Sequence, residues 1–260
     1  MHGHAAGGGI DGLYVRGTSP VHRLAPATKI AATVAFVFAV VVTRREAVWA
    51  FGVHAGLVAS VAGLAGLRPG LVVRRLRIEI PFLLFAVFMP FTGAGPRVDV
   101  LGVSLSEPGL WAAWNIAVKG TLGVAASIVL AATTPVAELL RGLDRLRVPR
   151  VVTAIAGFMV RYLGIVAGEA RRMHVARQSR GYEPRWLWQA RGTAASAGTL
   201  FVRSYERGER VYFAMLARGY DGSMPPLDTL GGRPSPAPPR WSAAVVPAAA
   251  WAVAAGALVV

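Results

Sequence analysis

Apolar stretches of about the length of a membrane-spanning helix recur along the chain, separated by segments rich in arginine. A helix needs about 20 mostly apolar residues to cross a bilayer. Four stretches come close to this length, at residues 27–43, 46–67, 109–132 and 241–260. The pattern predicts a transmembrane helix in each of them.

A fifth apolar stretch, residues 78–91, is too short to cross a bilayer by itself and contains Glu79 and Pro81. We extend it back to Leu71, because arginine side chains near the end of a span can reach the lipid headgroups. The arginines concerned are Arg74, Arg75 and Arg77. The sequence therefore predicts an all-α integral membrane protein with about five transmembrane helices, four of them within residues 27–133.

The composition agrees with a membrane protein. The chain has 260 residues, of which 54% are hydrophobic and 16% charged, whereas soluble proteins carry about 25% charged residues. It contains no cysteine, which excludes disulfides, thiolate metal sites and cysteine nucleophiles. The N-terminus lacks the basic start and the apolar run of a cleavable signal peptide. We assign its two histidines, His2 and His4, no role.

The basic residues are distributed unevenly, and they accumulate on the cytoplasmic side of membrane proteins. Residues 134–240 hold 17 of the 28 basic residues, whereas residues 92–108 hold only Arg97. With five spans, this places residues 134–240 and the N-terminal segment 1–26 inside and residues 92–108 outside. Membrane topology also accounts for the net charge of +15 without a nucleic-acid partner.

The basic region before the last span divides into two parts. Residues 134–222 predict cytoplasmic amphipathic helices, the first at 135–149, and the proline-rich residues 223–240 predict a semi-rigid linker to the C-terminal span 241–260. Residues 151–167 are apolar but hold Arg161 near their centre. A span there would move a basic cluster to the other side, so we predict a helix under the membrane or buried in the protein.

A short motif occurs twice in this region. The two copies read Ser179-Arg180-Gly181-Tyr182-Glu183 and Ala217-Arg218-Gly219-Tyr220-Asp221. Each follows a helix-forming run, at residues 151–179 and 193–217, and arginine followed by glycine is typical of a helix C-terminus. One copy would need no explanation beyond a helix cap, but two copies with the same tyrosine and acid favour a pair of docking tips. An arginine guanidinium there presents a rigid fork of donors to a partner's carboxylate or carbonyl groups.

Catalytic and nucleotide-binding motifs are absent from the sequence. The chain has two lysines, Lys29 and Lys119, and neither lies in a phosphate-binding loop; no H-E-x-x-H, G-x-S-x-G or metal-spaced cluster occurs. We predict a non-catalytic chain that binds no metal. Lys119 falls near the bilayer midplane in the fourth span and needs a partner there. The alternatives are an intramembrane structural contact with Asn115 or Glu79, or a contact with another membrane subunit.

These residues resemble the transmembrane T component of energy-coupling factor (ECF) importers, and within it the CbiQ-type subunit of cobalt transporters. The two arginine motifs are similar to the family's paired Ala-Arg-Gly signatures, which end its cytoplasmic coupling helices, although Ser179 replaces the first alanine. Residues 19–29, 133–149 and 203–222 are also similar to the family, with Ala25 where an aspartate is usual. The resemblance extends over about residues 14–222.

The resemblance implies a subunit that couples two cytoplasmic ABC-type ATPases to a CbiM-like substrate-binding membrane subunit in a bacterial or archaeal cell (inner) membrane. The ATPases would bind ATP, and this chain would hold no cofactor. The implied ATPase-coupling residues are Ser179, Arg180, Gly181, Ala217, Arg218 and Gly219. One alternative is a T component of a nickel or vitamin importer. Another, in a different class, is a membrane-embedded enzyme acting on an anionic lipid, although acidic motifs such as D-D-x-x-D are absent.

Overall fold

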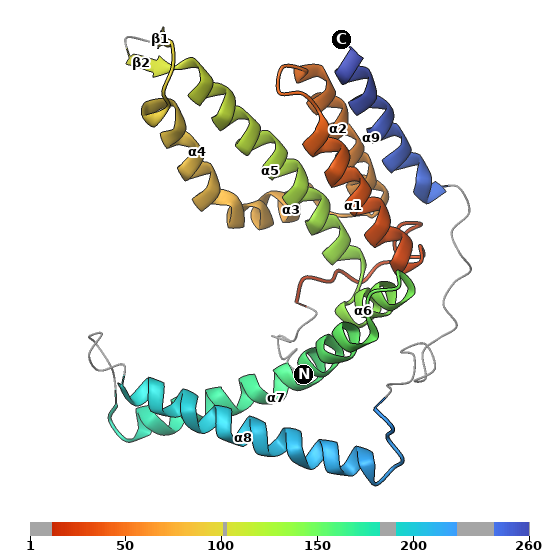
Figure 1. Ribbon diagram of the computed structural model, residues 1–260, viewed down its shortest axis with the longest axis vertical. Helices are drawn as coiled ribbons and strands as arrows, with labels where there is room; N and C mark the ends of the chain where they lie inside the picture. The colour runs from red at the N-terminus through yellow and green to blue at the C-terminus, as the bar shows by residue number, and fades with distance from the viewer. Residues whose placement is uncertain (1–11, 101–102, 183–190, 223–241, 260) are drawn as a thin grey trace, which may run out of the picture. The chain divides into compact units, whose positions relative to one another are not determined.

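The computed structural model describes residues 12–100, 103–182, 191–222 and 242–259 (Figure 1). The chain divides into two compact units. The bundle unit contains the described residues of 13–146 and 242–259, and the paired-helix unit contains those of 147–222. The predicted linker at 223–240 and the histidines His2 and His4 lie outside the described residues.

Four long apolar helices form the bundle unit. They are α1 (Pro26–Val42), α2 (Val48–Leu64), α5 (Glu107–Thr133) and α9 (Ser242–Val259). Both α1 and α2 pack on α5 and on α9. Phe36, Phe51 and Leu122 are buried in the shared core, where Ala250 and Ala254 let α9 approach closely. The four predicted spans are therefore confirmed as helices. The sequence could predict them because the length of an apolar stretch depends only on neighbouring residues.

The fifth apolar stretch is helical but is not one continuous helix, and its crossing of the membrane stays a prediction. It consists of α3 (Pro69–Leu76), a 3₁₀ turn (Arg77–Glu79) and α4 (Ile80–Thr92), with α4 packed along α5 (Figure 1). Pro81 lies in the first turn of α4, where its missing N–H costs no hydrogen bond. Glu79 is 3% exposed and accepts a 3.1 Å bond from the Thr121 hydroxyl of α5. This bond anchors the turn at which the helix is interrupted.

The segment that connects α4 to α5 contains a short β-hairpin, which the sequence did not predict. Its strands are β1 (Arg97–Val100) and β2 (Val103–Ser106), and they pair antiparallel with Arg97 opposite Ser106. Ser106 then starts α5, because its hydroxyl accepts a 3.3 Å bond from the Gly109 amide. Apart from this hairpin, the regular secondary structure of the described residues is helical, which confirms the all-α fold class.

Helix α6 (Val136–Arg145) is the predicted short amphipathic helix, and it packs on the start of α1. The contact depends on the buried Gly142. A Cβ atom at this position would lie 2.8 Å from Ile30 Cδ1 and 2.9 Å from the Ala27 amide nitrogen. Glycine therefore allows the two helices to approach more closely than any other residue would.

The paired-helix unit consists of α7 (Arg150–Ser179) and α8 (Arg191–Leu216). Glu169 of α7 accepts hydrogen bonds from Arg203 at 2.9 Å and Arg207 at 3.3 Å, both on α8. Arg177, near the end of α7, donates to the carbonyl of Gly192 at the start of α8. The two helices therefore run antiparallel, and the predicted helical runs are confirmed.

Two of the described helices, α5 and α7, are long and apolar enough to cross a membrane, and α1, α2 and residues 244–257 of α9 are shorter apolar helices. Helix α7 thus meets the same criterion of length and composition as a span. The prediction that residues 151–167 lie outside the bilayer stays a prediction.

Candidate functional site

Both copies of the arginine motif end their helices with the same backbone geometry. In the first, the Tyr182 amide bonds to the Arg177 carbonyl at 3.1 Å and the Gly181 amide to Gln178 at 2.9 Å. In the second, Tyr220 and Gly219 bond to the corresponding carbonyls, each at 3.0 Å. These pairs of bonds form Schellman caps, which require a left-handed residue after the helix.

Glycine supplies the left-handed residue in both caps. The φ angle is +75° at Gly181 and +84° at Gly219, a region that other residues enter only at a cost of about 1–2 kcal/mol. The prediction that each motif closes its helix with a left-handed glycine is confirmed. The cap fixes the preceding arginine, Arg180 or Arg218, at the tip of its helix.

Both tip arginines are exposed. Among the residues that the structure describes, neither Arg180 nor Arg218 has a hydrogen-bond or ion-pair partner. Each arginine follows the last residues of a helix, where positive charge is favourable. Within the described part of the chain, the donors of both arginines are therefore unused.

The two tips lie at opposite ends of the helix pair, because α7 and α8 are antiparallel and each tip ends one of them (Figure 1). Helix α8 has 26 residues, so its length separates the tips by about 39 Å at 1.5 Å per residue. The two tip arginines are therefore far apart within the paired-helix unit.

The tyrosines of the two motifs have different surroundings. The Tyr182 hydroxyl accepts a 3.2 Å bond from the Gly192 amide, and the Arg177 guanidinium lies 5.9 Å from the centre of the Tyr182 ring. A Cβ atom at Gly192 would lie only 2.6 Å from Tyr182 Cζ. The first tip is thus fastened to the start of α8. Tyr220 forms no corresponding bond within the described residues. Sequence reasoning missed Gly192, because nothing in the local pattern connects it with the motif.

One alternative in the sequence analysis was a contact of Lys119 with Asn115 or Glu79. That prediction was wrong, because Lys119 has a different partner. Lys119 Nζ donates a 2.8 Å bond to the Val41 carbonyl of α1, whereas Glu79 accepts from Thr121. Positions 119 and 121 lie about 200° apart around a helix, so they face opposite sides of α5. The Asn115 Oδ1 atom is buried without a hydrogen-bond partner in the described part of the chain.

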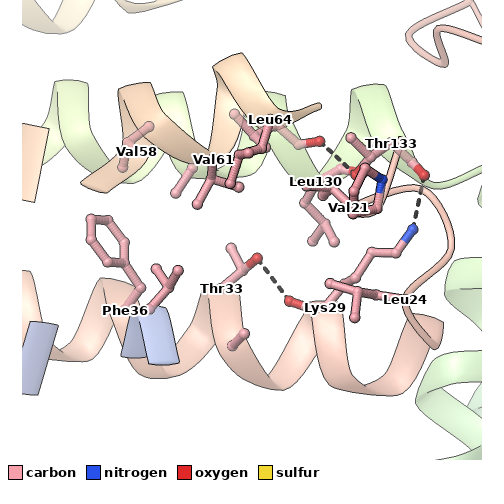
Figure 2. Close-up of a pocket in the computed structure, with 15 residues that line it drawn as sticks. Val21, Leu24, Lys29, Thr33, Phe36, Val58, Val61, Leu64, Leu130 and Thr133 are labelled. Atoms are coloured by element: carbon pink, nitrogen blue, oxygen red, sulfur yellow. Dashed lines mark hydrogen bonds between the residues drawn. The ribbon is translucent and has the colours of Figure 1, made fainter. Parts of the chain in front are cut away.

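Lys29 of α1 bonds to the end of α5, just as Lys119 of α5 bonds to the end of α1. The sequence analysis gave Lys29 no role. It is 6% exposed, and its ammonium donates to the Thr133 carbonyl at 2.9 Å, Thr134 Oγ1 at 3.1 Å and the His22 carbonyl at 3.2 Å. Figure 2 shows the bond from Lys29 to Thr133. An ammonium has three donors, so all the donors of Lys29 are used inside the protein. Its position in the first turn of a predicted span was the one signal in the sequence.

His22 holds the segment that precedes α1. Its Nε2 atom lies 3.0 Å from the Val15 carbonyl, and its Nδ1 atom lies 2.7 Å from the Ser19 hydroxyl. Because a carbonyl only accepts, Nε2 donates to Val15. The Val15 amide in turn donates to the Ala132 carbonyl near the end of α5 at 2.9 Å. Residues 15–22 are thereby fixed against the same end of the bundle unit as Lys29.

The described residues contain no group of three histidine, cysteine, aspartate or glutamate side chains that could hold a metal ion. The arginine tips and the two lysine contacts are therefore the features of the described chain that need a functional or structural explanation.

Comparison with known proteins gives a consistent family. The family model for the cobalt transport protein CbiQ matches residues 17–227. The cobalt transport protein CbiQ of Rhodobacter capsulatus is 34% identical over 138 residues, which are 53% of this chain and 55% of that protein. The energy-coupling factor transporter transmembrane protein EcfT of Bacillus selenitireducens is 28% identical over 228 residues, which are 82% of this chain and 84% of that protein.

A putative fused cobalt transport protein CbiMQ of Methanocorpusculum labreanum is 28% identical over 145 residues, covering 54% of this chain and 24% of that protein. The matches thus span about a quarter of this fused relative and about half of the CbiQ relative. The family match, by contrast, extends over most of the chain and includes both arginine tips and both lysines. The chain belongs to the CbiQ family of cobalt transport proteins.

Proposed function

We propose that this chain is the transmembrane coupling (T) subunit of an ECF-type ABC importer for cobalt ions. In this role it transmits the ATP-driven motion of cytoplasmic ATPase subunits to a substrate-binding membrane subunit. The observation that supports the role most directly is the pair of identically capped, exposed arginines at opposite ends of α7 and α8. The family match supports the transport of cobalt.

Each arginine tip would insert into a groove of one ATPase subunit. A guanidinium donates several hydrogen bonds in a fixed plane, and the Schellman cap holds it at the helix end. The separation of about 39 Å between the tips favours two ATPase subunits over one. Because Glu169 joins α7 and α8 through Arg203 and Arg207, a displacement of one tip would be passed to the other helix.

The exposed apolar side of α7 supports a second partner, the CbiM-like substrate-binding membrane subunit. Val151, Ile155, Met159 and Leu163 recur every fourth residue and are all exposed, Met159 by 67%. Residues with this spacing lie on one face of a helix, and a large exposed apolar face marks an interaction site.

ATP would be bound by the ATPases, and this chain would be non-catalytic and hold no cofactor. The N-terminus and the α7–α8 pair would lie in the cytoplasm of a bacterial or archaeal cell.

A second candidate function differs only in the substrate. The EcfT relative matches this chain over more of both proteins than the CbiQ relative does. This supports, as the alternative, a T component of an ECF importer whose substrate is not cobalt, for which nickel or a vitamin are the candidates.

The test is co-purification of the tagged chain from its native host in mild detergent, with mass spectrometry of the proteins recovered. We expect ABC-type ATPases and a membrane subunit with the unchanged chain, and loss of the ATPases with the double variant Arg180→Ala, Arg218→Ala. Arg210→Ala is the matched control, since Arg210 is an exposed arginine of α8 outside the tips. Equal recovery of ATPases with the double variant would refute the coupling role of the tips.

A further inference from the structure

The bundle unit contains an apolar cavity of about 210 Å³ between α1, α2 and α5 (Figure 2). Its walls include side chains from each of these helices, namely Ala32, Phe36, Val58, Val61, Val129 and Leu130. Helices α1 and α2 both pack on α5 and on α9, and the Phe36 ring of α1 also meets the His54 ring of α2 edge to face, with their centroids 5.7 Å apart. It lies toward the end of the unit where Lys29 meets Thr133.

The polar side chains at the cavity leave no free hydrogen-bond donor for a ligand. Lys29 uses its three donors on protein acceptors. The Thr33 hydroxyl donates to the Lys29 carbonyl at 2.8 Å, and the Thr133 hydroxyl donates to Val129 at 2.9 Å. A water molecule needs two to four polar partners to be stable in such a place. The chemistry of the walls therefore selects a hydrocarbon.

The cavity is open to its surroundings and large enough for part of an acyl chain. Leu64, at its rim, is 63% exposed. A cavity of about 150 Å³ lined by similar side chains stays dry and binds benzene, and this cavity is larger. Because the helices around it are apolar and the chain belongs to a membrane family, the hydrocarbon at hand is a lipid acyl chain.

The rim segment indicates which lipid headgroup fits. Val21 and Leu24 line the cavity, and the described segment 12–24 that contains them carries the exposed Arg16 and Arg23. Basic segments at a membrane surface attract anionic headgroups. We propose that the cavity binds an acyl-chain segment of an anionic phospholipid, with the headgroup at Arg16 and Arg23. This inference does not depend on the proposed coupling function.

The experiment uses the purified full chain in nanodiscs that contain a phosphatidylglycerol with a photoactivatable diazirine in its acyl chain. The labelled residues are mapped by tandem mass spectrometry. We expect the cavity walls to be labelled at least fivefold more than outward-facing positions of α1 such as Val34, which is 49% exposed. The same probe with a phosphatidylcholine headgroup should label the walls at least threefold less.

Two variants fill the cavity from opposite walls, Ala32→Leu on α1 and Val61→Phe on α2. Each should abolish the labelling of the walls, whereas the outward-facing controls Val34→Leu and Val53→Phe should not change it. A thermal unfolding curve shows which variants are folded. Equal labelling of walls and outward positions in the unchanged chain would overturn the site, and equal labelling by both headgroups would overturn the anionic preference.

Discussion

The ammonium of Lys29, on α1, donates a 2.9 Å hydrogen bond to the carbonyl of Thr133, the last residue of α5. Lys119, on α5, donates a 2.8 Å bond to Val41 in the last turn of α1. The last four carbonyl groups of a helix have no partner within the helix, and they carry partial negative charge. The two lysines of the chain therefore cap each other's helices, and these contacts fix α1 and α5 antiparallel at two levels.

Replacement of Lys29 by methionine should destabilise the bundle unit strongly. The change leaves the carbonyl of Thr133 and the hydroxyl of Thr134 buried without their donor, and an orphaned buried acceptor costs about 1–3 kcal/mol. We expect a clear fall in the thermal unfolding midpoint in detergent. Arg23→Gln, a change at an exposed position on the adjacent segment, is the control and should leave the midpoint unchanged. An unchanged midpoint in Lys29→Met would contradict the capping role.

Lys119→Leu should have a smaller effect, because Lys119 is only partly buried and makes one hydrogen bond. The loss of such a bond costs about 0.5–1.5 kcal/mol. We expect a modest decrease in the unfolding midpoint, with impaired assembly or transport only as far as stability falls. Normal stability combined with a loss of transport would instead favour a contact of Lys119 with another membrane subunit.

Gly142→Ala should separate α6 from α1. The added methyl group would meet the Ala27 backbone at 2.9 Å, and backbone atoms cannot move aside as the end of a side chain can. Overpacking of this kind costs about 1–3 kcal/mol. Gly123→Ala in α5 is the matched control, since a Cβ atom there has nothing within 4 Å. Hydrogen exchange of the α6 amides should rise in Gly142→Ala and stay constant in the control.

The contact between α7 and α8 should weaken in acid. The hydrogen bond from Arg203, and then the charges of Arg203 and Arg207, lower the pKa of Glu169 below its ordinary value of 4.5. Because the pKa of Glu169 is lowered in the folded state, its contact with the arginines stabilises the helix pair fully at pH values above 4.5, the ordinary pKa. This stabilisation is lost as the pH falls through the lowered pKa of the folded state.

Glu169→Gln removes the charge and serves as the comparison. At pH 7 the unchanged chain should have the higher unfolding midpoint, and the difference between the two proteins should shrink below pH 4.5. A difference that stays constant down to pH 3 would show that Glu169 acts through something other than its charge.

The sequence by itself determined the features that depend on neighbouring residues. The apolar lengths of α1, α2, α5 and α9 and the Schellman caps of the two arginine tips follow from local pattern, because a helix satisfies its backbone within itself and a glycine adopts a left-handed angle without outside help. The functional resemblance was carried by the same local motifs.

The tertiary structure alone decided which distant groups meet. The partner of Lys119 depended on which face of α5 meets α1, and the partner of Glu79 depended on which face of α5 meets the turn before α4. The role of Lys29 depended on the end of α5, which lies far away in the sequence. These contacts join residues from different helices, and the energy that selects them arises only when the helices pack, so no local pattern encodes them.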